Sequence, residues 1–557
     1  MTTQDPAAVA FEAADYSTAL SLLLSESRDR DMTSDSQRRR HRHNVIVTDY
    51  LLTGVNDATS LLRSLESLDL ASADDVDERV VLRYNRAVLH VRLCEFAHAR
   101  DLIAPVYAIR SQLDLGLTIK IALLLLDVYV RTRNIEKAES VLEDLTTIKT
   151  QLLSSPPSSS EPPVNCTPVP SPTELAVWIH LYQTRIHFMS RNDRSAKKIV
   201  KSALQILNKD NEPFISDFHK ASALLVKARL ECCNDKWIKA IKLLNNVQYS
   251  CPTNPQVTAV YLNNLGCVHF AMQRYSAAAF YFQRALSVAG TVHDSSLGPQ
   301  IRFNRGVQLM HVAGGAMAKD AVRELSLSVS SIYGSAWLWL LLGAATAQQY
   351  AVWRSAEPFI VRIPETMSAQ QVPRLQLMRS RHPPDALLAD LMSGHTHYRN
   401  ALALSKSPQI TQMALLGLAY ICLALHRFSE ALHWLDQVNV SAVDGADRHV
   451  SLLVRLYRCE ALCALARFDD ALLCMSEVVP SDHADELVHV YGALCTAYCL
   501  AGKFEQALAC ALKAHDASPS DVWALRILMY ILLRHRAHSE ALYVMYHRSP
   551  PPSLLRQ

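Results

Sequence analysis

One spacing recurs along this 557-residue chain: a small residue, an aromatic residue nine positions later, and an alanine three positions after that. Residues 261–290 contain one copy, formed by Gly266, Tyr275 and Ala278. Side chains three and four positions apart share a helix face, so each copy predicts two amphipathic helices joined by a tight turn. Further copies begin at Ala87, Ala228, Ala419, Cys459 and Cys495, and weaker ones centre on Ala138, Ala196 and Ala541.

The small residues predict where the two helices of a pair touch. Helices approach to about 8–10 Å, and at the short end of that range the contacting side chains must be small. Gly266 falls on the inner face of the first predicted helix, and Ala278 and Ala285 on the inner face of the second. We expect these three residues to lie at the contact between the helices.

The period of the copies identifies the repeat. Ala431, Ala471, Ala507 and Ala541 are 40, 36 and 34 residues apart. A period near 34 with this signature is typical of the tetratricopeptide repeat. Such helix pairs cannot bury their apolar faces alone, so they stack. We therefore predict an all-α fold: a tetratricopeptide-repeat α-solenoid, a right-handed superhelix of helical hairpins with a concave groove.

Changes in composition divide the predicted solenoid. The segment 151–173 is rich in Pro and Ser and is predicted to be a disordered loop. The segment 351–385 has several prolines and no steady period, and is predicted to be an irregular insertion. The remaining predicted parts are N-terminal repeat-like helices (1–150), a central array (174–350), a C-terminal array (386–548) and a flexible tail (549–557).

Charge and composition exclude several classes of protein. A formal net charge of +3 does not support nucleic-acid binding driven by bulk charge. The start of the sequence lacks the pattern of a signal peptide, and no uninterrupted apolar run is long enough for a membrane span. The thirteen cysteines are scattered, which predicts free thiols in a reducing compartment.

Two cysteine pairs on predicted helices have a spacing that suits half of a metal site. Cys459 with Cys463, and Cys495 with Cys499, are four positions apart. We interpret them as buried core thiols, because a zinc site would need facing Cys or His residues as well. Motifs for phosphate binding, serine hydrolysis or zinc proteolysis are absent. We expect no catalytic residue, no metal, no cofactor and no small-molecule ligand.

Two histidine pairs and one basic run remain. His41 with His43, and His395 with His397, have a ligand-like spacing but no acidic companion motif, so we interpret them as surface histidines. The basic run 38–42 suits RNA or an acidic partner, or simply a solvated helix end, which is the default interpretation.

The repeat register also predicts which residues line the groove. Large apolar patches are seldom left exposed on soluble monomers, so a groove lined by such residues should be filled. A partner segment and the chain's own residues 351–385 are the alternatives. The predicted lining residues are Val81, Tyr84, Val88, Val91, Val260, Asn263, Cys267, Phe270, Ala271, Met413, Leu416, Tyr420 and Leu423.

A chaperone-binding tetratricopeptide domain holds a peptide carboxylate with Lys, Asn and Arg side chains in its groove. Asn263 and Cys267 occupy the corresponding positions in one repeat of this chain, and Leu416 and Tyr420 occupy them in another. The basic residues are absent from both, which disfavours a chaperone clamp.

Specific stretches of the sequence resemble a known family. They are 263–286 (NNLGCVHFAMQRYSAAAFYFQRAL), 301–314 (IRFNRGVQLMHVAG) and 336–347 (AWLWLLLGAATA). In this order they resemble the tetratricopeptide subunit, number ten, of the CCR–NOT messenger-RNA deadenylase complex. The resemblance covers about 75–345, with repeats in the expected place at 410–545, and it is lost over 350–400.

The resemblance implies a non-catalytic scaffold that supports mRNA decay and translational repression. Its implied partners are the N-terminal region of the large scaffold subunit and subunit eleven, with only indirect association with mRNA and none with membranes. It implies a cytoplasmic location, and the nucleus is the second location that it allows. The alternative is a transient adaptor that is linked to chaperones or contacts RNA. An apolar groove favours the scaffold, and a basic groove favours the adaptor.

Overall fold

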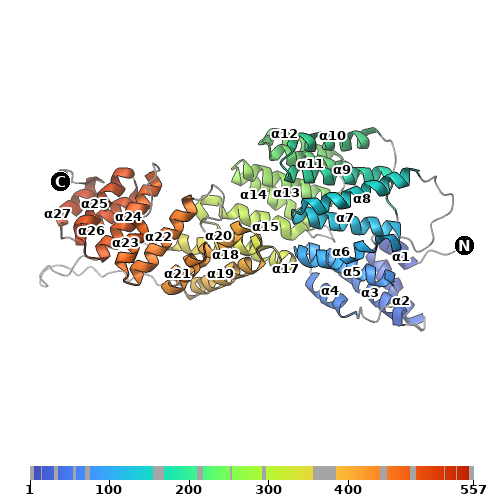
Figure 1. Cartoon of the computed structure of the whole chain (residues 1–557), viewed down its shortest axis with the longest axis horizontal. Coiled ribbons are helices and arrows are strands. Elements are labelled where there is room, and N and C mark those ends of the chain that lie inside the picture. Colours follow the sequence, from blue (N-terminus) through green and yellow to red (C-terminus); the bar gives the residue numbers. More distant parts are fainter. Residues whose placement is uncertain are drawn as a thin grey trace. The chain divides into compact units, whose positions relative to one another are not determined.

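The computed structural model of the chain is helical throughout the part that it describes. The described residues are 6–13, 15–29, 35–53, 58–68, 76–154, 169–209, 217–250, 254–290, 297–355, 384–438, 448–476, 484–519, 521–534, 536–547 and 549–550. They contain α-helices and two short 3-10 helices, with no strand. Two compact units, Met1–Leu338 and Trp339–Gln557, are described separately (Figure 1).

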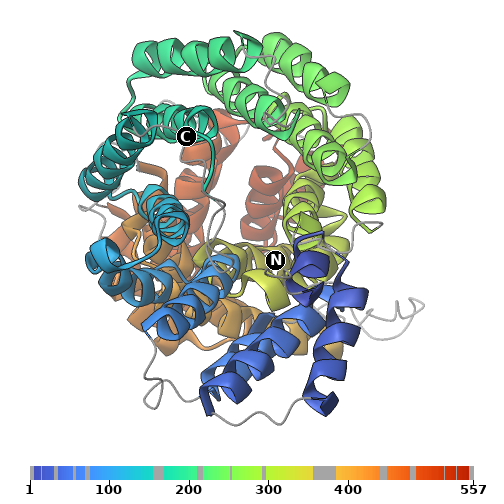
Figure 2. The ribbon, with the colours of Figure 1, turned by 90° about the vertical axis from the view of Figure 1, so that its right-hand side faces the viewer.

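Helices of the first unit pair with their neighbours in the chain, and Figure 2 shows the pairs, blue to yellow-green, following one another in a curved row. The short helices η1 (Arg110–Gln112), η2 (Val312–Gly315) and α17 (Val329–Ile332) complete the unit. The pairs are α1 (Pro6–Glu12) with α2 (Tyr16–Asp29), α3 (Asp35–Leu52) with α4 (Ala58–Glu66), α5 (Val76–Arg92) with α6 (Phe96–Ala108), α7 (Leu115–Arg131) with α8 (Ile135–Ser154), α9 (Pro172–Met189) with α10 (Asp193–Lys209), α11 (Asp217–Cys232) with α12 (Trp237–Ser250), α13 (Pro255–Ala271) with α14 (Tyr275–Ala289), and α15 (Leu297–Met310) with α16 (Ala318–Ser326).

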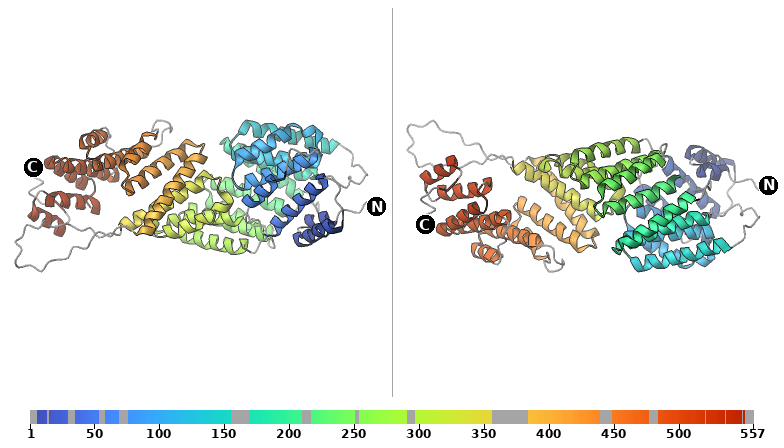
Figure 3. Two further views of the ribbon diagram at one scale, coloured as in Figure 1. Left: turned by 90° about the horizontal axis from the view of Figure 1, so that it is seen from below. Right: turned by 90° about the horizontal axis from the view of Figure 1, so that it is seen from above.

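The second unit repeats the same plan, and Figure 3 shows its succession of helices, orange to red, from two sides. Helix α18 (Ala336–Ser355) crosses the boundary between the units, and α19 (Asp385–Leu404) follows it. The hairpins are α20 (Pro408–Ala424) with α21 (Phe428–Asp436), α22 (Arg448–Ala464) with α23 (Phe468–Ser476), α24 (Ala484–Leu500) with α25 (Phe504–Ala517), and α26 (Val522–Arg534) with α27 (His538–His547).

Nine hairpins share one turn. In each, a residue with positive φ stands two positions before the second helix. The next N–H bonds back to a carbonyl five residues earlier, as Arg274 does to His269 at 2.9 Å, which is the Schellman helix ending. A single repeated turn therefore sets the geometry of each pair. The nine residues are Cys94, Arg133, Arg191, Asp235, Gln273, His426, Ala466, Gly502 and Arg536.

Small residues lie where the helices touch, as the sequence predicts. A Cβ added to Gly266 on α13 would lie 2.6 Å from the ring of Phe282 on α14. Ala278 and Ala285 on α14 are completely buried. Close approach of the two helices therefore depends on these three small side chains, and the prediction is confirmed.

The core of the first unit runs from hairpin to hairpin. Ile103, Leu125, Leu145 and Leu175, from α6, α7, α8 and α9, are almost completely buried in one hydrophobic cluster. The first helix of each hairpin also packs against the first helix of the next, from α5 through α15. Each pair thus buries its apolar faces on its neighbours, as a solenoid requires.

The predicted segments fall partly outside the described residues. Of the predicted loop 151–173, residues 155–168 lie outside them, whereas 151–154 continue α8 and α9 begins at Pro172. Of the predicted insertion 351–385, residues 356–383 lie outside them, and 351–355 continue α18. Residues 551–557 of the tail also lie outside. Among the described helices, none combines the length and apolar character that crossing a bilayer requires.

Candidate functional site: the inner groove of the first unit

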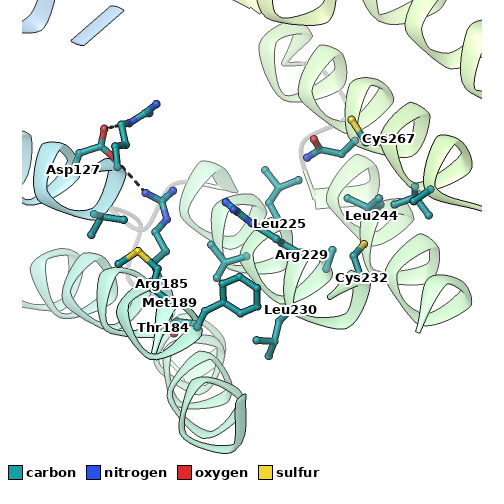
Figure 4. Close-up of a pocket in the computed structure, with 18 of the residues that line it drawn as sticks. Asp127, Thr184, Arg185, Met189, Leu225, Arg229, Leu230, Cys232, Leu244 and Cys267 are labelled. Carbon is teal, nitrogen blue, oxygen red and sulfur yellow. Dashed lines mark hydrogen bonds and ion pairs between the residues drawn. The ribbon is translucent and has the colours of Figure 1, made fainter. Parts of the chain in front are cut away.

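A cavity of about 970 Å³ runs along the first helices of consecutive hairpins in the first unit. Most of its lining residues come from α7, α9, α11 and α13, and α15 adds Gln300 (Figure 4). Each of these helices packs against the next, so that equivalent repeat positions follow one another along the cavity. We call this cavity the inner groove.

One repeat position forms a polar row along the inner groove. It lies eleven residues before the buried alanine of the following helix. Asp127, Arg185, Arg229 and Cys267 occupy it in α7, α9, α11 and α13, and the corresponding alanines are Ala138, Ala196, Ala240 and Ala278. The repeat register therefore aligns side chains that are 38 to 58 residues apart in sequence.

Basic side chains outnumber acidic ones in this groove. Asp127 accepts hydrogen bonds from Arg131, at 2.6 Å, and from Arg185, at 3.4 Å (Figure 4). Arg229, one repeat further along, forms no ion pair with any described residue. Arg133 and Arg191 also line the cavity, which gives five arginines against one carboxylate. The groove therefore has an excess of positive charge.

Aromatic rings support three of these arginines. The guanidinium carbon of Arg131 lies 5.7 Å from the ring centre of Phe96. Arg185 lies 5.1 Å from the ring of Tyr182, and Arg229 lies 5.9 Å from the ring of Phe188. Stacking of this kind covers a face of the guanidinium plane and leaves its N–H groups available to an anion.

Most of the remaining lining is apolar or carries thiols, and Thr184, Asn264 and Gln300 add uncharged polar groups. Leu225 and Val226 come from α11, and Val268 comes from α13. Burial raises the pKa of both Cys232 and Cys267 to about 11, so these thiols are protonated at neutral pH. The inner groove therefore combines guanidinium groups with apolar side chains.

Of the groove residues predicted on α13, some line the inner groove and others contact the next hairpin. Cys267 and Ala271 line the inner groove. Asn263 accepts a hydrogen bond from Asn304 on α15, at 2.9 Å, and the ring of Phe270 lies 5.2 Å from that of His311. Val260 is half-buried. These contacts join α13 to the following hairpin.

The residues predicted on α5 lie outside the lining of the inner groove. Val81 is exposed, and Val88 is half-buried. Tyr84 and Val91 pack against the core cluster that extends from α5 to α9. Their proposed contact with a partner stays a prediction.

The residues predicted on α20 belong to the second unit. Leu416 and Leu423 are buried in its core, with exposed fractions of 9% and 7%. Tyr420 lies 6.0 Å from Tyr457, ring centre to ring centre, and Met413 is exposed. Of these four side chains, Met413 offers the largest accessible surface.

The arginines of α7, α9 and α11 were not among the predicted lining residues. The signal was present, because the positions equivalent to Cys267 and Ala271 include Arg131, Arg185 and Arg229. Basic side chains are absent from the corresponding positions of α13 and α20, as the sequence indicates. They are present in α7, α9 and α11, so their absence does not extend to the first unit as a whole.

The cysteine pairs considered as metal ligands lie in hydrophobic cores. Cys459 is buried beside Met475, and Cys463 packs against the same cluster. Cys495 and Cys499 are buried with Leu528 and other residues of α24 to α27. Their interpretation as core thiols agrees with these positions.

The histidine pairs are less exposed than expected. The side chain of His395 is only 12% exposed, and its Nε2 lies 3.4 Å from Glu430. His397 is also largely covered, with its ring 5.5 Å from that of Trp339. His41 and His43 are half-buried on α3. The surface interpretation is therefore wrong for His395, and the other three histidines are partly buried, because the helix carrying each pair packs against neighbouring helices.

The basic run 38–42 forms part of a contact between helices. Arg39 on α3 bonds to Glu78 on α5 at 3.2 Å, and Arg40 lies 3.9 Å from the same carboxylate. The side chains of Arg39 and Glu78 are 19% and 11% exposed. This pair is mostly buried, which differs from the expected solvated helix end.

Comparison with known proteins identifies the repeat and a set of relatives. A family model of the tetratricopeptide repeat matches residues 259–291, the α13–α14 hairpin. CCR4-NOT transcription complex subunit 10-A of Xenopus laevis is 24% identical over 335 residues, covering 53% of this chain and 43% of the relative. Subunit 10 of Drosophila melanogaster is 24% identical over 352 residues, covering 55% and 52%. The chain spans about half the length of these curated relatives.

Solved structures show more distant similarity. A tetratricopeptide repeat protein from Parabacteroides merdae aligns with 56% of this chain and 98% of its own, at 13% identity and a TM-score of 0.36. The tetratricopeptide assignment depends on the family model, the repeated turn and the stacked helix pairs. The chain is an all-α tetratricopeptide-repeat solenoid.

Proposed function

We propose that this tetratricopeptide-repeat chain, which is related to subunit 10 of the CCR4-NOT complex, acts as a non-catalytic subunit of such a complex. The relationship to the Xenopus and Drosophila proteins is the observation that carries the proposal. A solenoid suits the role, because its stacked hairpins present an extended surface to other proteins.

The proposed partners are the N-terminal region of the large scaffold subunit and subunit eleven. The chain would hold these subunits together and so support mRNA decay and translational repression, with mRNA bound by other subunits. This role places it in the cytoplasm, and in the nucleus where the complex also acts there. The order of the resembling stretches 263–286, 301–314 and 336–347 supports these partners.

A non-catalytic role is consistent with the distribution of acidic residues. Metal-dependent nucleases use clustered carboxylates to hold their ions. Among the described residues, groups of three potential metal ligands occur at His90, Glu95 and His98, and at His395, Cys422 and Glu430. Each group contains one carboxylate. Neither group offers the arrangement on which such a nuclease depends.

Reconstitution from purified proteins tests the proposal. We expect the full chain to co-elute in gel filtration with the N-terminal region of the large scaffold subunit and subunit eleven, and to shorten no poly(A) substrate by itself. Failure to co-elute with either protein would refute the scaffold role. Poly(A) shortening that persists through successive purification steps would refute the non-catalytic role.

A second candidate function follows from the inner groove. Its five arginines favour a transient adaptor that binds an anionic ligand, of the chaperone-linked or RNA-contacting kind. Binding dominated by exposed charges weakens as salt screens them, whereas a largely apolar interface resists salt. A pull-down repeated at high salt separates the two functions, since the scaffold partners should remain bound and an electrostatic ligand should be released.

A further inference from the structure

We propose that the inner groove binds an acidic peptide segment of a partner protein, with carboxylates on Arg185 and Arg229 and apolar side chains against Leu225 and Val268. This inference rests on the proposed function, in that it takes the occupant to belong to a protein partner. It adds the chemical class of the bound segment and the residues that receive it.

Asp127 already shows how the groove receives a carboxylate. Its two oxygens bond to Arg131 and Arg185, at 2.6 and 3.4 Å, at the α7–α9 step. Arg229 occupies the same repeat position at the next step and has no acidic partner among the described residues. The side chain of Arg185 is 42% exposed, so part of it remains accessible despite its bond to Asp127. A ligand carboxylate placed between Arg185 on α9 and Arg229 on α11 would be bound by two arginines, as Asp127 is bound by Arg131 and Arg185.

The spacing between these arginines suits a peptide. Neighbouring helices are about 8–10 Å apart, and an extended chain advances about 3.3 Å per residue. Acidic residues two positions apart point to the same side of such a segment, so their carboxylates can reach both guanidinium groups. In an extended segment the intervening side chains point to the opposite side, where apolar ones can contact the apolar lining.

Single-stranded RNA fits the groove less well. Proteins that bind it usually stack bases on accessible aromatic rings. The aromatic residues of the lining are Phe188 and Trp237. Phe188 lies beneath Arg229, and Trp237 packs against the core cluster that contains Leu244 and Leu265. Both rings are already engaged, so neither is available to stack on a base.

Charge also disfavours the chain's own insertion as the occupant. Segment 351–385 contains five arginines and three acidic residues. Its net positive charge does not complement a groove with five arginines and one carboxylate. An acidic segment from another protein complements that excess.

Fluorescence anisotropy on the purified full-length chain tests the inference. The probe is a fluorescein-labelled peptide of four Glu-Leu-Glu-Phe repeats. The comparison ligands are the same peptide with Gln for Glu, the same peptide with Lys for Glu, and an oligoadenylate of similar length. We expect the acidic peptide to bind more tightly than the other three.

Variants of the two arginines locate the binding. We expect Arg229→Ala to weaken acidic-peptide binding about tenfold, the loss expected for one charge-assisted contact. We expect Arg185→Glu combined with Arg229→Glu to abolish it and to create binding of the Lys peptide. Arg284→Ala is the matched control, because Arg284 also lies over an aromatic ring, Phe280, but is exposed on α14 away from the groove. The control should bind as the parent does.

Three outcomes would overturn the inference: equal binding of the Gln and Glu peptides, unchanged binding in both groove variants, or tighter binding of oligoadenylate that is lost in Arg229→Ala. The last would assign the groove to RNA. Because the assay contains no subunit of the complex, its failure is separate from a failure of the reconstitution experiment.

Discussion

At the scale of single residues, Gly266 and Ala278 show how closely the packing constrains side-chain size. Gly266 faces the Phe282 ring, and Ala278 is completely buried between helices. These positions were predictable, because repeat spacing and helix geometry together require small side chains there. The ring that fills the space beside Gly266 was not predictable, because several large residues of α14 share the pattern.

Replacing Ala278 with tryptophan should force α13 and α14 apart. We expect Ala278→Trp to lower the free energy of unfolding by at least about 1–3 kcal/mol, since a well-packed contact cannot take in a large ring. Urea denaturation followed by circular dichroism measures the change. Gln283→Trp is the control, because Gln283 is exposed on the same helix. Equal stability of Ala278→Trp and the parent would show that the interhelix placement is wrong.

Cysteine reactivity should follow burial in the inner groove. Burial raises the pKa of Cys267 and Cys232 to about 11, so little reactive thiolate exists near neutral pH. Cys233 is exposed, although burial also raises its pKa. We expect iodoacetamide at pH 7.5 to label Cys233 well before Cys267 and Cys232, as followed by fragment-ion mass spectrometry. Unfolding in guanidinium should equalise the three rates.

At the scale of elements, the hairpin was predictable and its turn was not. The small–aromatic–alanine spacing locates the two helices of each pair. Eight of the nine turn residues with positive φ are not glycine, so the residue type gives no signal for this conformation. The Schellman bond and the packing of the two helices impose it, and both depend on contacts beyond the turn itself.

Placing glycine at a turn residue with positive φ should stabilise the second unit. Ala466 has a φ of 60°, a left-handed conformation that costs an L-residue about 1–2 kcal/mol and that glycine adopts freely. Glycine also makes the unfolded chain more flexible, which lowers the free energy of unfolding by about 0.4–1 kcal/mol. We expect Ala466→Gly to raise the free energy of unfolding by about 0.5–1 kcal/mol. Ala509→Gly, at an exposed position inside α25, should instead lower it by about 1 kcal/mol. A loss of stability in Ala466→Gly would contradict the assigned turn.

At the scale of the whole molecule, the class of fold was predictable and the character of the groove was not. Stacking follows from the period and from apolar faces that one hairpin cannot bury alone. The charge of the groove depends on a few positions in α7, α9 and α11, including Arg185 and Arg229. Other predicted lining residues, such as Leu416, are apolar. An apolar side chain is equally suited to the hydrophobic core, and Leu416 is buried there.

Accessible and buried members of the predicted lining should behave differently. Val81 and Met413 are exposed, at 38% and 47%, so we expect Val81→Glu and Met413→Glu to retain the parent's melting temperature. At least one of them should reduce co-purification with the large scaffold subunit or subunit eleven. Tyr420→Ala should lower the melting temperature, because its ring packs near Tyr457. Full capture by both Glu variants would exclude these positions from the interface.

Each hairpin of the first unit packs on the hairpins that precede and follow it in the chain. A displacement imposed at one end is shared among the junctions between α5 and α15, and each junction shifts by only a fraction of it. We therefore expect the spacing between Arg185 on α9 and Arg229 on α11 to change by only a small part of such a displacement. A solenoid of this kind can thus adjust its pitch to a bound segment, at an elastic cost spread over several repeats.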